Sequence, residues 1–225
     1  MFTYLASLTP AHDPVVDCAR GNGQAAVGLA THFTRVIAIH RSADQLSHAV
    51  KHSRIEYHLR TAEQIDLPDH CADLLTGAQA LHWFDLPAVY RDVRRVLEPD
   101  GVLAVWVYTL NRVDDDFDAL VRHYHDEIVG PYWPEERRLV TDEYRSLPFP
   151  LREHTPPPIE MTTEWTPERI LGYLHSWSAR QRYIDRNGSN PIDLLADDLA
   201  RAWGRTTVRS VSWPLSLRVG VLQES

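Results

Sequence analysis

A glycine-containing loop between an apolar run and a helical pattern is the first stretch whose residue types could do chemistry. The apolar run at residues 15–18 carries Asp17, and the loop after it contains Gly21 and Gly23. Glycines at such a turn let the backbone come close to a ligand, because they have no Cβ atom. The N–H groups at the start of the next helix favour polar or negative ligand groups. The pattern predicts a binding loop at the end of a strand, with a simple tight turn as the alternative.

A second group of polar and aromatic residues follows another apolar run. Residues 72–76 predict a buried strand, and Gln79, His82 and Trp83 come shortly after it. In an open α/β sheet, ligands bind beyond the carboxyl ends of the strands, so these side chains are expected at the binding edge. Histidine changes its charge near neutral pH, so His82 could act as a general base. The alternative is that His82 and Trp83 only cap and pack this turn.

The first loop resembles motif I of the class I S-adenosylmethionine-dependent methyltransferases of the small-molecule type. That motif reads acid-x-Gly-x-Gly-x-Gly, and the matching positions here are Asp17, Ala19, Gly21 and Gly23. The first glycine of the motif is therefore an alanine in this chain. The resemblance implies S-adenosylmethionine as the cofactor and a small organic molecule as the methyl acceptor.

Two later stretches resemble the same family. The segment from Gln79 to Trp83 matches its Gln-x-x-His-Trp pattern, and residues 95–103 match its Arg-Val-Leu-x-Pro-x-Gly-Val-Leu run, with Asp100 where glycine is usual. Motif by motif, the resemblance covers residues 14–107. Beyond that range it is one of arrangement and length.

The resemblance also implies a set of site residues. Asp17 would orient the first loop and reach the amino-acid end of the cofactor, His40 would lie at the ribose, and Glu63 would line the adenine. The full cofactor-binding set that it implies is Asp17, Ala19, Gly21, Gly23, His40, Ala62, Glu63, Ala78 and Gln79. The substrate set is His82, Trp83, Tyr132 and Trp133, with His82 as the catalytic residue and no metal.

Departures from the family pattern leave a second function open. His40 stands where the family has an acid that accepts hydrogen bonds from both ribose hydroxyls, and a neutral histidine can accept only one. Ala19 replaces a loop glycine, and the chain has room for about one short helix before the first strand, where relatives carry more. The alternative is therefore a degenerate, non-catalytic relative that acts as a binding or interaction protein with weakened or lost cofactor binding.

The periodicity of the chain predicts an α/β fold. The continuous apolar run at residues 36–39 suits a buried parallel strand, the mostly apolar stretches at residues 15–18 and 72–76 predict two more strands, and helical patterns lie between these stretches. With the resemblance, this predicts a Rossmann-like methyltransferase fold with a mostly parallel seven-stranded sheet, flanking helices and a C-terminal antiparallel edge strand. We expect one domain over residues 1–225, in which residues 109–158 form a helical and aromatic insertion that covers the substrate.

Composition limits the partners. The 225 residues carry a net charge of -8, which argues against nucleic acid, because phosphate binding needs a basic surface. No apolar run reaches the length of a membrane span, no secretory signal is visible, and two cysteines make no disulfide framework. These features predict a cytoplasmic protein with a small-molecule substrate and no membrane partner, while the edge strand leaves a homodimer open. The seven tryptophans predict packing, with an aromatic substrate pocket as the alternative.

A cluster of His123, His125, Asp126 and Glu127 invites a metal-binding interpretation. Residues 117–128 read as one amphipathic helix, and successive helical positions point to different faces. These side chains would not converge on one ion, so the sequence predicts no metal site here.

Overall fold

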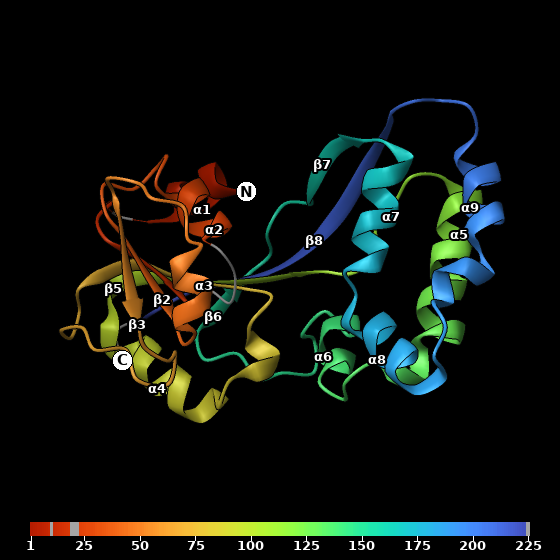
Figure 1. Cartoon of the computed structure of the whole chain (residues 1–225). Helices are drawn as coiled ribbons and strands as arrows, with labels where there is room; N and C mark the ends of the chain where they lie inside the picture. Colours follow the sequence, from red (N-terminus) through yellow and green to blue (C-terminus); the bar gives the residue numbers. More distant parts are fainter. Residues whose placement is uncertain (10, 19–22, 224–225) are drawn as a thin grey trace. The chain divides into compact units, whose positions relative to one another are not determined.

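The chain divides into two compact units (Figure 1). In this computed structural model, which describes residues 1–9, 11–18 and 23–223, the first unit comprises Met1–Val107, Asp142–Ile159 and Ser216–Ser225. The second unit comprises Tyr108–Thr141 and Glu160–Leu215. The insertion expected at residues 109–158 is thus shared, with residues 109–141 in the second unit and residues 142–158 in the first.

A mostly parallel sheet forms the first unit. Its parallel strands pair in the order β3-β2-β1-β4-β5, with the bounds β1 (Val15–Cys18), β2 (Val36–His40), β3 (Ile55–Leu59), β4 (Ala72–Ala78) and β5 (Leu97–Tyr108). Strands β1 and β2 are buried along their whole length, which explains why their side chains other than Asp17 and His40 are apolar.

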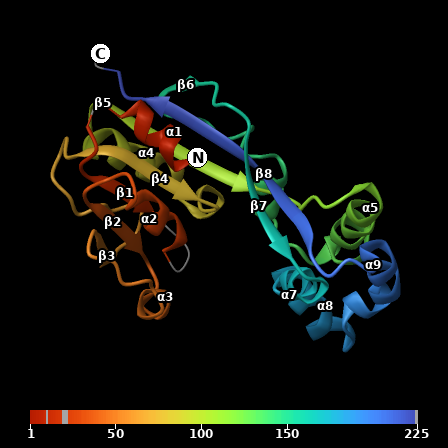
Figure 2. The same ribbon diagram turned by 90° about the horizontal axis from the view of Figure 1, so that it is seen from above.

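The C-terminal strand β8 (Arg209–Val221) extends this sheet (Figure 2). It pairs with β5, with the antiparallel strand β6 (Arg152–His154) and with β7 (Ile159–Trp165). The Rossmann-like methyltransferase fold predicted from the sequence, with antiparallel pairing at its C-terminal edge, is confirmed. The described residues form eight strands in place of seven, because β8 is thirteen residues long and takes more than one partner.

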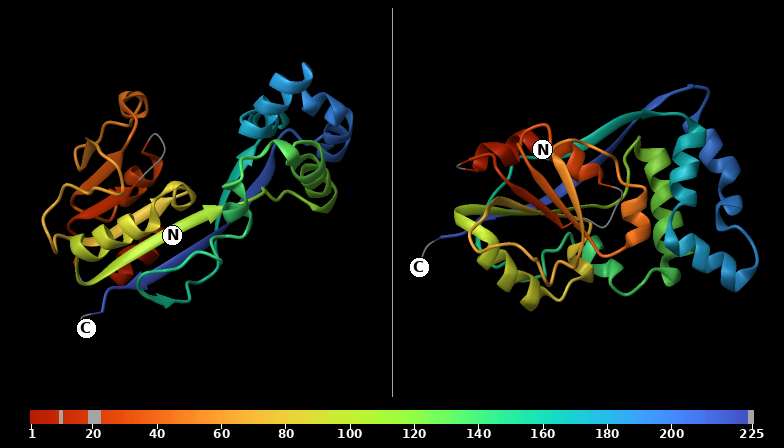
Figure 3. Two further views of the ribbon diagram at one scale, coloured as in Figure 1. Left: turned by 90° about the horizontal axis from the view of Figure 1, so that it is seen from below. Right: turned by 60° about the vertical axis from the view of Figure 1, so that its left-hand side comes forward.

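Helices cover both faces of the parallel sheet. The chain moves from β1 to β2 in one direction along the sheet and from β4 to β5 in the other, so right-handed crossovers place their helices on opposite faces. Accordingly α2 lies on one face and α4 on the other (Figure 3). The helices of this unit are α1 (Phe2–Leu8), α2 (Gln24–Leu29), α3 (Ala43–Ser47), the short 3-10 helix η1 (Leu81–Trp83) and α4 (Leu86–Val96).

Glycine at position 28 allows α1 to pack closely on α2. A Cβ atom at Gly28 would overlap the ring of Phe2, whereas a Cβ atom at Gly172, in helix α7 (Pro167–His175) of the second unit, would meet no neighbouring atom of the described residues within 4 Å. We expect Gly28→Ala to destabilise the fold by about 1–3 kcal/mol, because overpacking outweighs the gain in helix propensity. Gly172→Ala is the matched control and should stabilise by about 0.5–1 kcal/mol. Urea unfolding of the two variants measures both values, and equal effects would contradict the close packing of α1 on α2.

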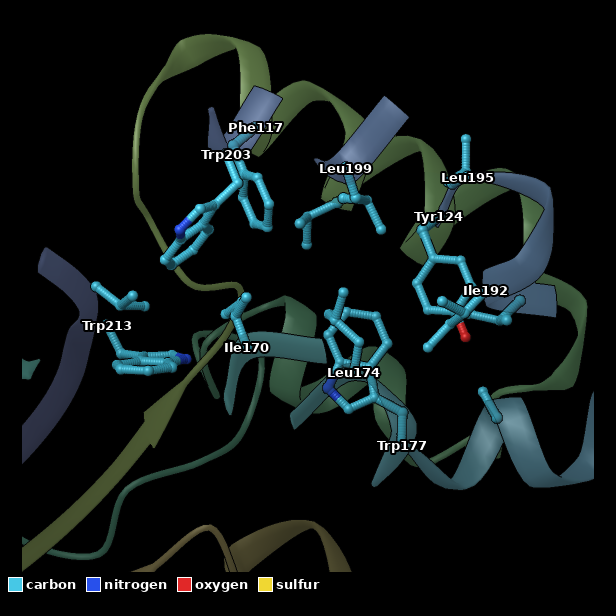
Figure 4. Packing of buried hydrophobic residues seen from close by; sticks show 14 residues of the cluster. Phe117, Tyr124, Ile170, Leu174, Trp177, Ile192, Leu195, Leu199, Trp203 and Trp213 are labelled. Carbon is cyan, nitrogen blue, oxygen red and sulfur yellow. The ribbon is translucent and has the colours of Figure 1, made fainter. Parts of the chain in front are cut away.

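The second unit is a helical cluster around an aromatic core. Its helices are α5 (Asp115–His123), the π-helical turn η2 (Tyr124–Ile128), η3 (Gly130–Tyr132), α6 (Arg137–Thr141), α7 (Pro167–His175), α8 (Ser178–Asn187), η4 (Pro191–Leu194) and α9 (Ala196–Trp203). Phe117 meets Trp203 edge to face with ring centroids 5.5 Å apart, and Tyr124 stacks on Trp177 (Figure 4). Three of the tryptophans, Trp177, Trp203 and Trp213, are buried in this core, so for them the packing interpretation holds.

Candidate cofactor and substrate site

The carboxyl ends of the central strands meet at one edge of the sheet. In the parallel register Asp17 lies beside Ala38 on one neighbour and Thr76 on the other, and His40 lies beside Leu59. Each strand therefore delivers the loop that follows it to the same edge, which is where open α/β sheets bind ligands.

Asp17 is a fully buried carboxylate at this edge. The hydroxyl of Thr76 donates a hydrogen bond of 2.6 Å to Oδ1 of Asp17, while Oδ2 is buried and has no hydrogen-bond partner among the described residues. Burial raises the pKa of Asp17 to about 6, against the opposing effect of the Thr76 hydrogen bond. A buried carboxylate oxygen that lacks a partner is costly, so it suits a site that a donor group of a ligand completes.

Gly23 occupies the N-cap of α2 in a left-handed conformation, with φ of 86°. A Cβ atom at this position would lie 2.6 Å from the hydroxyl of Tyr57, which itself donates to the carbonyl of Val50. Only glycine fits this turn without strain. The other two loop positions predicted from the sequence, Ala19 and Gly21, lie outside the described residues.

A pocket opens beside the ends of β1, β2 and β3. The residues that line it are Cys18, Ile39, Arg41, Arg60, Thr61, Ala62, Glu63 and Phe84. Of the predicted cofactor residues, Ala62 and Glu63 lie in this lining. Burial and the nearby charge of Asp17 raise the pKa of the Cys18 thiol, so the thiol stays protonated and is a poor nucleophile.

His40 is buried at the end of β2, where its ring already makes a local hydrogen bond. The Nδ1 atom accepts from the backbone N–H of Ser42 at 2.9 Å. A neutral His40 bonded in this way carries its proton on Nε2, so that nitrogen offers a donor and no acceptor. The single acceptor expected of His40 from the sequence is therefore used within the turn.

Helix α4 holds the loop that carries Ala62 and Glu63. Asp92 accepts from the backbone N–H of Ile65 at 2.7 Å. The Arg95 guanidinium donates to the carbonyl oxygens of Ile65 at 2.5 Å and Leu67 at 2.7 Å, and it pairs with Asp69 at 2.9 Å. Two side chains of one helix thus fix the loop, which sets the position of the pocket wall.

The second predicted group follows β4. Ala78 ends the strand opposite Trp106, and Gln79 has a left-handed backbone with φ of 49° while its N–H donates to the carbonyl of Trp106 at 2.9 Å. His82 lies on η1, and its Nδ1 atom is 2.7 Å from the hydroxyl of Tyr144. Trp83 is 41% exposed, with its ring centroid 4.9 Å from that of His82.

The predicted substrate residues Tyr132 and Trp133 belong to the second unit. Trp133 lines a groove of that unit with His125, Asp126 and Arg137 among others, and the Arg137 guanidinium lies 4.6 Å from the centre of its ring. Burial lowers the pKa of His125, whose Nδ1 atom is 2.6 Å from a carboxylate oxygen of Asp126. A substrate role for Tyr132 and Trp133 therefore stays a prediction.

Several residues that shape this edge could not be found from local sequence pattern. Tyr57, Thr76, Asp92 and Tyr144 each contact a predicted site residue or its loop from a distant part of the chain. Only Arg95 carried a signal, because it opens the Arg-Val-Leu run. Within the described ranges there is no group of three or more metal-ligating side chains, and no helix there is long and apolar enough to cross a membrane.

Comparison with known proteins agrees with this geometry. A family model described as a methyltransferase domain matches residues 16–105. A candidate methyltransferase of Dictyostelium discoideum is 34% identical over 197 residues, covering 86% of this chain and 75% of that protein. A candidate S-adenosylmethionine-dependent methyltransferase of Saccharomyces cerevisiae is 28% identical over 142 residues, and the match spans 58% of this chain but only about half, 49%, of the yeast protein.

A solved structure shows the same fold over the whole chain. It is that of a candidate type II methyltransferase from Anaeromyxobacter dehalogenans, with a TM-score of 0.94, 38% identity, and coverage of 100% of this chain and 96% of the other. Together with the Dictyostelium relative, this similarity favours a methyltransferase over the degenerate binding protein. The chain belongs to the family of class I S-adenosylmethionine-dependent methyltransferases.

Proposed function

We propose that this chain binds S-adenosylmethionine at the carboxyl edge of the sheet and transfers its methyl group to a small organic acceptor. The observation that carries the proposal is the buried Asp17 at this edge, whose Oδ2 atom lacks a hydrogen-bond partner among the described residues, beside the left-handed Gly23. When bound, S-adenosylmethionine supplies an electrophilic methyl group on a positively charged sulfur.

The residues of the edge have separate parts in this proposal. Asp17 accepts a hydrogen bond at the amino-acid end, directly or through the loop, and Gly23 leaves room for the ligand to lie against the backbone. Ala62 and Glu63 line the adenine, and His40 donates from Nε2 at the ribose. Since the reacting groups need little chemistry from the protein, catalysis rests mainly on proximity and orientation.

The acceptor side of the proposal rests on the residues after β4. Gln79 and His82 border the methyl group, and the half-exposed Trp83 offers an apolar surface for an organic acceptor. The net charge of -8 supports a small molecule and not a nucleic acid as the acceptor.

Isothermal titration of the purified chain with S-adenosylmethionine and S-adenosylhomocysteine tests the proposal. We expect micromolar dissociation constants for both ligands. Absence of binding up to about millimolar in a folded sample, a free-energy difference of about 4 kcal/mol, would overturn it.

The hydrogen bonds from α4 to the loop that carries Ala62 and Glu63 give a further prediction. Arg95→Met removes the donors to the carbonyl oxygens of Ile65 and Leu67, so the pocket wall loosens. We expect about a tenfold loss of affinity for S-adenosylmethionine, because ordering the loop then costs part of the binding energy. Arg94→Met is the matched control, since Arg94 donates to the carbonyl of Pro150, away from the loop. Equal titration curves for the two variants would contradict this role of Arg95.

A further inference from the structure

A hydrogen bond joins two residues of the first unit that are 62 positions apart. The Nδ1 atom of His82, on η1, lies 2.7 Å from the phenolic oxygen of Tyr144. Tyr144 is completely buried, and the two ring centroids are 5.9 Å apart. The partner of His82 is therefore a fixed side chain, held by packing on all sides.

The chemistry of the two groups indicates which atom donates, because a distance of 2.7 Å lies within the range of both hydroxyl and N–H donors. A phenol is a strong donor and a weak acceptor, while an unprotonated imidazole nitrogen is a good acceptor. This chemistry thus favours a Tyr144 O–H that donates to Nδ1. In neutral His82 the proton then resides on Nε2.

The backbone at Tyr144 is strained and is held in place by other residues. Glu143 and Tyr144 have φ values of 57° and 61°, in the left-handed region that non-glycine residues avoid. Arg218 donates to the carbonyl oxygens of Tyr144 at 2.7 Å and Leu147 at 2.8 Å. Strain of this kind persists only where the surroundings fix it, and it is concentrated at functional sites. The strained backbone of this turn places the hydroxyl of Tyr144 beside His82.

We propose that Tyr144 is a positioning residue that holds His82 as a neutral hydrogen-bond donor through Nε2–H. This inference rests on the proposed function, and it changes the part of His82 in it. A ring protonated on Nε2 cannot take a proton there, so His82 orients the acceptor and does not act as its base. The acceptors that fit are those whose nucleophilic atom has no proton to lose at working pH, such as an oxyanion.

Transfer of the methyl group to such an oxyanion then needs no base. A lone pair of the oxyanion forms the new bond to the methyl carbon, and the sulfur keeps the electron pair of the bond that breaks. The positive sulfur and the negative oxygen both become neutral, and no proton moves. The Nε2–H group of His82 contributes a hydrogen bond that fixes the oxygen in line with the methyl group.

Nitrogen-15 NMR of the histidine side chains tests the inference without any ligand. The His82 signals are assigned by their loss in a His82→Gln sample. We expect the wild type to show a single tautomer at neutral pH, with the proton on Nε2 and the unprotonated shift on Nδ1. In Tyr144→Phe we expect a mixture of both tautomers. Tyr90→Phe is the matched control, because it removes another buried phenol that donates to a nearby carbonyl, that of Pro148, and leaves His82 unchanged.

The wild-type spectrum is decisive even if Tyr144→Phe does not fold. A proton on Nδ1 of wild-type His82 would overturn the inference, since Nε2 would then be available as a base. An unchanged tautomer in a folded Tyr144→Phe sample would also overturn it. Titration of the same samples with S-adenosylmethionine separates the two proposals. If the wild type shows the Nε2–H tautomer but does not bind S-adenosylmethionine, only the proposed function is contradicted.

Discussion

Asp17→Asn is expected to make the protein more stable at pH 8 while weakening its affinity for S-adenosylmethionine. The pKa of Asp17 is raised from 3.8 to about 6 by burial, so its carboxylate is held in the charged form at a cost. That shift corresponds to about 3 kcal/mol. An amide of the same shape carries no charge and avoids this cost, while it keeps an acceptor for the Thr76 hydroxyl.

The sign of the pH dependence follows from linkage. Because the pKa of Asp17 is higher in the folded chain than in the unfolded one, its contribution to stability is present below about pH 4 and is lost as pH rises through 6. We therefore expect the variant to match the wild type near pH 4 and to exceed it by up to about 3 kcal/mol at pH 8. Urea unfolding at several pH values measures the difference. The exposed Asp197→Asn is the control, and an equal response of the two variants would contradict a burial effect at Asp17.

The expected loss of affinity for S-adenosylmethionine in Asp17→Asn comes from the Oδ2 atom of Asp17. A hydrogen bond to a charged group contributes roughly 1.5–3 kcal/mol, so replacing the Oδ2 acceptor by an amide nitrogen should weaken binding about ten- to hundredfold. Isothermal titration at pH 8 checks this value. A variant that is both more stable and equally tight would show that the partner of Asp17 is not the cofactor.

Gly23→Ala is expected to abolish detectable binding of S-adenosylmethionine. The left-handed backbone costs a non-glycine residue about 1–2 kcal/mol, and the new Cβ atom would meet the Tyr57 hydroxyl at 2.6 Å. Gly188 has a similar φ of 72°, and a Cβ atom there would meet no described atom within 4 Å, so Gly188→Ala controls for backbone strain alone. Thermal unfolding and isothermal titration of both variants separate stability from affinity.

A double variant distinguishes the two effects at Gly23. Tyr57→Phe removes the hydroxyl that lies 2.6 Å away and leaves ring carbons at 3.3 Å and beyond, so it should restore part of the stability of Gly23→Ala. If Gly23 gives room to the cofactor, affinity stays lost in the double variant. Recovery of affinity along with stability would contradict the proposed cradle, because the clash with Tyr57 would then explain the whole effect.

Local pattern was sufficient for the parallel half of the sheet. The runs at residues 15–18 and 36–39 became β1 and β2, buried on both faces. Pattern was less informative in the second unit. Residues 117–128, read as one helix, form α5 and then the π-helical turn η2, because burial of Tyr124 against Trp177 depends on packing and not on periodicity.

Residues close together in the chain were enough to establish the family resemblance, the strand ends, Asp17 in the first strand and the glycine of the loop after it. The hydrogen bonds and burial of the site residues depend instead on long-range contacts. Thr76 and burial leave one Asp17 oxygen without a partner among the described residues, Arg95 holds the loop of Ala62 and Glu63, and Tyr144 bonds His82. These contacts join residues about 30 to 62 positions apart. No local periodicity records such pairs, because the fold brings them together through sheet register and helix packing.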